Sequence, residues 1–228
     1  MIGLIIVLIG IPFLIGLYAQ WKVSSAFKHW KTVAATSGVS GAEAAQRILA
    51  AANIHDVEVV EIQDMLGDHY DPTHKRLCLS PEVYRTPSVA SLGIAAHECG
   101  HAIQHARAYG PLGLRMAVVP ATMAVSRILP FVLIAGFFIP ALGFHAILIA
   151  AICYSVLAFF QLVTLPVEFD ATRRAKVILG QMRLIQPGAE TDGVNNVLDS
   201  AALTYVAAFV AVLGQLLYYV LILLGNRR

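Results

Sequence analysis

The sequence has few charged residues. Only 13% of its 228 residues are Asp, Glu, Lys or Arg, whereas 58% are hydrophobic and the mean hydropathy is +0.71. Soluble globular domains average about 25% charged residues, so this composition excludes an ordinary soluble domain. The charges are also unevenly distributed, because long stretches contain none. We expect these stretches to span a membrane.

Three stretches without Asp, Glu, Lys or Arg predict four transmembrane helices. Residues 2–18 approach the roughly 20 residues that one span requires, and residues 201–224 form a further span. As one helix, residues 128–167 would be about 60 Å long, twice the ~30 Å hydrocarbon core. We therefore expect a helical hairpin there, turning near residues 140–145.

The first stretch lacks the features of a cleavable signal peptide. No basic residue precedes it, and residues 19–22 (AQWK) are a poor small-x-small cleavage site. We interpret it as a retained anchor, with a signal peptide as the alternative.

The few cysteines and the distribution of basic residues both bear on the orientation of the chain in the membrane. Cys78, Cys99 and Cys153 are odd in number and show neither disulfide nor metal-site spacing, which agrees with a reducing compartment. All sixteen Lys and Arg residues except Arg227 and Arg228 lie on one side of a four-span arrangement. The positive-inside rule places that side in the cytoplasm.

Residues 97–101 form an HExxH sequence. The residues before it predict the first turns of a helix, with Thr86 as the N-cap. On a helix, His97 and His101 stand one turn apart on the same face, so both imidazoles can reach one metal ion. Glu98 is rotated by about 100° and can take a proton from a bound water without being a ligand. This arrangement is typical of zinc metalloproteases, with Glu98 as general base. A chance match on an unrelated helix is the alternative.

A zinc site of this kind needs a third protein ligand. His105 lies about 12 Å of helix rise beyond His97, so a straight helix cannot bring both to one ion together with His101. The histidine ten residues beyond the first, used by metzincins, is absent. Glu168 is the better candidate, because it lies where the charge-free stretch ends and ionisable residues near spans tend to be functional. A simple charge at the membrane surface is the alternative.

Three residues are candidates for supporting roles. Asp170 can hold a metal ligand in place. Tyr205 and His105 can each donate a hydrogen bond to the oxyanion of the tetrahedral intermediate. For Tyr205, an interfacial tyrosine at the start of the last span is the alternative.

Residues 54–62 and 75–80 predict two β-strands. In the second, the alternation of polar and apolar residues favours an edge strand with one wet face. Metalloproteases often hold a peptide substrate as an added strand on such an edge. Leu77, Cys78 and Leu79 are therefore candidate substrate-binding residues, and an ordinary hairpin is the alternative.

Five ordered motifs follow the N-terminal anchor. They are DHYDP at 68–72, LSPEVY at 79–84, HECGHAIQH at 97–105, LPVEFDA at 165–171 and AALTYVAA at 201–208. In this order they resemble the YugP-like family of bacterial membrane zinc metallopeptidases, over nearly the whole chain. The resemblance implies His97 and His101 as ligands of one Zn²⁺ ion, Glu98 as catalytic base and Glu168 as third ligand.

The same family resembles the HtpX and CAAX-processing membrane gluzincins, which also place a glutamate ligand after a hydrophobic hairpin. Those enzymes carry an aspartate four residues after the glutamate, where this chain has Thr172. The resemblance therefore implies Asp170 as the substitute for that aspartate.

Together the predictions give a mainly α membrane protein, with about four transmembrane helices and a small α+β zincin-like cytoplasmic domain that carries the HExxH helix. We expect five segments: an anchor (1–20), the zincin-like domain (21–115), a transmembrane hairpin (116–166), a cytoplasmic segment with the third zinc ligand (167–200) and a last span (201–228).

The predicted function is that of a zinc-dependent metalloendopeptidase in the bacterial inner (plasma) membrane, multi-pass, with its active site facing the cytoplasm. We expect a peptide or protein substrate and the lipid bilayer as partners, and no nucleic acid. The alternatives are a catalytically inactive membrane scaffold and a metal-dependent hydrolase of lipidated peptides.

Overall fold

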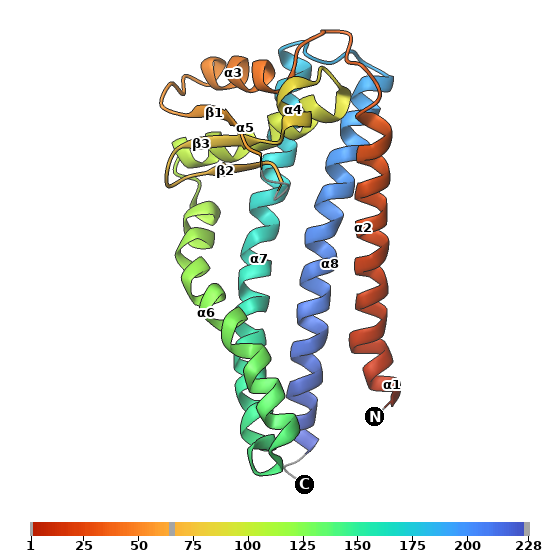
Figure 1. Ribbon diagram of the computed structural model, residues 1–228, viewed down its shortest axis with the longest axis vertical. Coiled ribbons are helices and arrows are strands. Elements are labelled where there is room, and N and C mark those ends of the chain that lie inside the picture. Colours follow the sequence, from red (N-terminus) through yellow and green to blue (C-terminus); the bar gives the residue numbers. More distant parts are fainter. Residues whose placement is uncertain (1, 64–66, 226–228) are drawn as a thin grey trace. The chain divides into compact units, whose positions relative to one another are not determined.

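The computed structural model describes residues 2–63 and 67–225 and is mostly helical (Figure 1). Among these residues, four helices are long and apolar enough to cross a membrane: Ile2–Trp30, Gly110–Phe138, Pro140–Gln181 and Ala189–Gly225. Four such helices are the number that the charge-free stretches predict. Arg227 and Arg228, which enter the orientation argument, lie outside the described residues.

The elements follow one another in a simple order. The chain begins with α1 (Ile2–Ile5), a π-helical turn (Ile6–Gly10), α2 (Ile11–Trp30) and α3 (Gly41–Ala51). It continues with β1 (Glu58–Glu61), β2 (His69–Asp71), β3 (Arg76–Leu79), α4 (Pro81–Arg85) and α5 (Val89–Ala106). It ends with α6 (Gly110–Phe138), a 3-10 turn (Pro140–Leu142), α7 (Gly143–Gln181) and α8 (Ala189–Gly225).

The described chain divides into two compact units. The first comprises the described parts of Met1–Gln20, Gly113–Leu165 and Thr204–Arg228, and the second comprises those of Trp21–Leu112 and Pro166–Leu203. The first unit therefore contains the apolar lengths of the long helices. The second contains the sheet, α3 to α5, and the adjoining ends of α2, α7 and α8.

The predicted hairpin in the first unit is formed by α6 and α7. The turn between them lies at Pro140–Leu142, within the range 140–145 where a turn is predicted. The two helices pack closely, because a Cβ atom on Gly136 would lie 2.3 Å from Cβ of Ala146. Helix α6 begins at Gly110, well before the charge-free stretch, so that two arginines lie within it.

The sheet in the second unit has the order β1-β3-β2, with β1 parallel and β2 antiparallel to β3. The prediction that Leu77, Cys78 and Leu79 form an edge strand is wrong, because β3 is paired on both sides. Its faces are also covered: Leu77 and Leu79 are fully buried and Cys78 is 8% exposed. The alternation of polar and apolar residues does not reveal which strands pair. Strand β2 has only three residues, too few for a recognisable strand pattern in the sequence.

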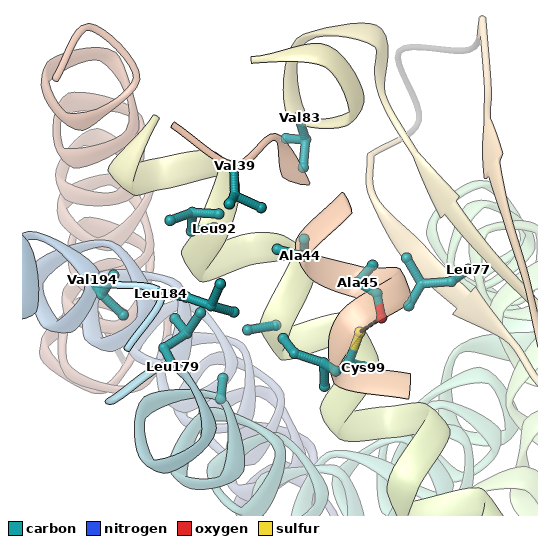
Figure 2. Close-up of a cluster of buried hydrophobic side chains, with 14 of the residues drawn as sticks. Val39, Ala44, Ala45, Leu77, Val83, Leu92, Cys99, Leu179, Leu184 and Val194 are labelled. Atoms are coloured by element: carbon teal, nitrogen blue, oxygen red, sulfur yellow. Dashed lines mark hydrogen bonds between the residues drawn. The ribbon is translucent and has the colours of Figure 1, made fainter. Parts of the chain in front are cut away.

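The core of the second unit is formed by side chains of α5 together with side chains of α3, β3, α7 and α8 (Figure 2). Leu92 and Cys99 of α5 are fully buried there, with Ala44 and Ala45 of α3 and residues from α7 and α8. The thiol of Cys99 donates a hydrogen bond to the carbonyl of Ala45 at 3.7 Å. Cys99 is about 200° around the helix from His97, so this packing presents the HExxH face on the other side of α5.

Helix α5 begins later than its sequence indicates. The predicted N-cap was Thr86, whereas Ser88 is the cap, and its hydroxyl accepts a hydrogen bond from the Ser91 N–H. The reason is a long-range backbone pairing: Ala35 donates to the carbonyl of Pro87, and Ala34 and Ser88 form a β-bridge. This pairing keeps the preceding residues extended.

Candidate metal centre

The structure brings together the three residues that the sequence predicts as metal ligands. His97 and His101 lie on α5 and Glu168 lies on α7, all within the second unit. Their donor atoms lie within 4.8 Å of one another, so the group is able to hold a metal ion. Oε2 of Glu168 lies 3.2 Å from Nε2 of His97 and 3.5 Å from Nε2 of His101. Tetrahedral ligands with ~2 Å bonds stand about 3.3 Å apart, so this spacing fits Zn²⁺.

The Glu168 carboxylate is buried, so it needs positive charge nearby. Glu168 is 1% exposed and His101 is 9% exposed. Burial by itself would lower the pKa of His101, but its hydrogen bond to Glu168 and the charge of Glu98 outweigh burial and raise that pKa above the usual value. A buried carboxylate requires either protonated partners or a bound cation. The donor set of two imidazoles and one carboxylate is one that zinc accepts.

A buried glutamine fixes the tautomer of His101. Gln104 is fully buried, and its amide nitrogen donates to the carbonyl of Val167 at 2.8 Å and to Asp170 at 2.9 Å. Its amide oxygen is therefore left to accept the hydrogen bond from Nδ1 of His101, at 3.0 Å. With the proton on Nδ1, the lone pair of Nε2 is free for a metal ion.

Thr172 has the corresponding position beside His97. Its hydroxyl oxygen lies 3.3 Å from Nδ1 of His97. Asp170, the expected substitute for the missing aspartate, instead contacts Gln104, Arg173 and Arg174. It therefore reaches His101 only through the glutamine, and a role in holding a metal ligand stays a prediction.

Glu98 lies next to the three-residue group without belonging to it. Its side chain is buried, and Oε2 accepts a hydrogen bond from the backbone N–H of Tyr70 at 3.0 Å. Burial raises the pKa of Glu98 above the usual value of a carboxyl group. A carboxyl group with a raised pKa is better matched to proton transfer near neutral pH.

Comparison with known proteins decides the family. The family model described as "Putative neutral zinc metallopeptidase" matches residues 5–224. The chain belongs to this family. It is also 42% identical over 226 residues to "Putative membrane protease YugP" of Bacillus subtilis (strain 168), covering 99% of this chain and 97% of that protein. The resemblance inferred from the five motifs is thereby confirmed. No solved structure matches the chain.

In this metallopeptidase family member, two predicted residues lie outside the metal group. His105 is not among the donors, and its Nδ1 lies 2.9 Å from the hydroxyl of Tyr70. That position outside the group agrees with the helix rise, which is too large for His105 to share an ion with His97 and His101. Tyr205 belongs to the first unit, whereas the metal group belongs to the second. Oxyanion roles for His105 and Tyr205 stay predictions.

Three contacting residues were missed by sequence reasoning. Gln104 follows His101 by three positions and Thr172 follows Glu168 by four, so helical spacing places each pair on one face. Those spacings are a usable signal. Tyr70 reaches Glu98 across 28 residues of sequence, and no local pattern indicates that contact.

Close packing of α5 against α7 sets the position of the third donor. A Cβ atom on Gly100 would lie 2.9 Å from the carbonyl oxygen and 3.0 Å from Cα of Ala171, one turn from Glu168. We expect Gly100→Ala to push the two helices apart, at a cost of about 1–3 kcal/mol in stability. The displaced Glu168 should weaken zinc binding roughly 10- to 100-fold, as measured by competition with a chromogenic chelator.

Gly180→Ala is the matched control for this substitution. Gly180 also lies in α7, but no atom of the described residues is within 4 Å of the position of its added Cβ. Since alanine is the better helix former, this variant should keep its zinc affinity and gain about 0.5–1 kcal/mol. Equal zinc affinity in the Gly100→Ala variant and the wild type would contradict the packing argument.

Proposed function

We propose that this protein is a membrane-embedded, zinc-dependent endopeptidase of the gluzincin type. The observation that carries the proposal is the spacing of the three buried donors, two imidazoles and one carboxylate, which fits a tetrahedral ion. The buried Glu98 next to them and the metallopeptidase family support the same reaction.

In this proposal His97, His101 and Glu168 hold about one Zn²⁺ ion per chain. A zinc ion bound there would lower the pKa of a water molecule and polarise the scissile carbonyl. Glu98 accepts the proton of the attacking water and returns it to the leaving amine. The Tyr70 N–H keeps the Glu98 carboxylate oriented, and no covalent intermediate with the enzyme forms.

Strand β2 is the edge that we propose for peptide binding, in place of β3. The N–H of Tyr70 donates to Glu98 rather than to β3, so it points to the outer side of the sheet. In an antiparallel ladder, the carbonyl of the same residue points to that side as well. Because Glu98 holds the Tyr70 N–H, a peptide added to this edge would pair with the Tyr70 carbonyl, which would bring the peptide main chain close to Glu98 without strict sequence selection.

The first test of the proposal is metal-dependent proteolysis. Purified full-length protein in detergent is expected to cleave a casein-like substrate, to lose the activity on chelation and to regain it with Zn²⁺ but not Mg²⁺. Cleavage of lipidated peptides alone would favour the hydrolase of lipidated substrates. A zinc-loaded protein that cleaves neither substrate would favour the inactive scaffold.

We further propose that the metal centre faces the cytoplasm from the inner membrane. All Lys and Arg residues except the last two fall on one side of the four-span arrangement. A topology reporter fused at Gly67 should therefore read cytoplasmic, and one fused after Gly143 should read external. The reverse pattern would place the metal centre outside the cell.

A further inference from the structure

Tyr70 joins β2 to α5 at two points. Its backbone N–H donates to Oε2 of Glu98 at 3.0 Å, and its hydroxyl lies 2.9 Å from Nδ1 of His105. Glu98 and His105 are seven residues apart on α5, about two turns, and so share one face of the helix. One residue therefore bridges the strand to the helix through both its main chain and its side chain.

The environment of the tyrosine keeps its hydroxyl protonated. Burial, with the charges of Asp56 and Asp71, raises the pKa of Tyr70 to about 12. The hydroxyl therefore keeps its proton at neutral pH and forms a neutral hydrogen bond with Nδ1 of His105, in which the tautomer of the imidazole decides the donor. The two rings are tilted by 55° with their centroids 5.8 Å apart, so they are not stacked.

Strand β2 is tied to β3 by their antiparallel pairing and by the Asp68–Ser80 hydrogen bonds, whereas the two contacts of Tyr70 tie it to α5. The strand has only three residues and lies at an edge of the sheet. Next to the Tyr70–His105 pair is a cavity of about 340 Å³, bordered by both residues. Short edge strands beside a cavity open more readily than central strands, so we expect a hydrogen bond there to affect the position of the strand.

We propose that His105 is a positioning residue, which holds the Tyr70 hydroxyl and so keeps β2 where the Tyr70 N–H binds Glu98. The proposal deepens the proposed endopeptidase function and rests on it for its effect on turnover. His105 acts on the carboxylate through Tyr70 and does not bind the metal ion.

A double-mutant cycle with full-length, zinc-loaded protein tests this role. His105→Ala and Tyr70→Phe should each lower kcat roughly 10- to 100-fold while about one zinc per chain is retained. The double variant should be no slower than the slower single variant, because both changes remove the same hydrogen bond. His105→Asn should restore most of the activity relative to His105→Ala, because its amide places a hydrogen-bonding group near the position of Nδ1. Independent, multiplying losses would overturn the proposal.

Hydrogen exchange gives a readout that does not depend on activity. The amides of residues 67–72 should exchange faster in His105→Ala and Tyr70→Phe, while the amides of α5 keep their protection. His29→Ala, an exposed histidine of the same unit, is the control and should change neither exchange nor kcat. Unchanged exchange of 67–72 in both variants would overturn the positioning role. A zinc-loaded wild type without peptidase activity would instead overturn the proposed function, while the exchange result still stands.

Discussion

Glu98→Gln is expected to abolish peptide-bond hydrolysis in a protein that still binds about one zinc per chain. The amide has the shape of the carboxylate, and its oxygen can still accept the hydrogen bond from the Tyr70 N–H. It cannot accept a proton from water. General-base catalysis contributes about 10²–10⁴-fold, so we expect activity to fall by roughly 10³-fold or more.

The measurement pairs metal analysis with a proteolysis assay on the same preparation. Glu58→Gln is a suitable control, because Glu58 is an exposed glutamate on β1 and the substitution removes the same charge. The control should keep both zinc and activity. Wild-type turnover by the Glu98→Gln variant would contradict the general-base role of Glu98, since no proton acceptor would then be needed at this position.

Glu168→Ala is expected to strip the metal, whereas His105→Ala should leave it bound. Oε2 of Glu168 lies at ligand spacing from the imidazoles of both His97 and His101, and the side chain is 1% exposed. Its removal leaves two donors where zinc requires three. His105 contacts Tyr70 instead, so its removal slows turnover without loss of a donor.

Zinc content after dialysis against a weak chelator separates the two variants. We expect well below one zinc per chain for Glu168→Ala and about one for His105→Ala. A near-native thermal unfolding profile would show that the loss of metal comes from the missing donor and not from unfolding. A zinc-replete Glu168→Ala protein, or a zinc-free His105→Ala protein, would show that the third ligand has been assigned to the wrong residue.

The sequence by itself determined the features that depend on neighbours along the chain. The spacing of His97 and His101 requires only a helix to place both on one face. The absence of charge over long stretches required apolar helices, and 40 consecutive uncharged residues required a turn, which lies at Pro140–Leu142. His105 was excluded as a ligand by helix rise alone.

Tertiary structure decided what depends on how separate elements meet. β3 became a central strand through pairing with β1 and β2, and a strand's own residues do not specify its partners. Thr172 faces His97, and Asp170 faces Gln104, because of how α7 is rotated against α5. That rotation is held where Gly100 meets Ala171. Such contacts join residues that are distant in sequence, and the packing of the whole unit determines them. A local sequence pattern therefore does not predict them.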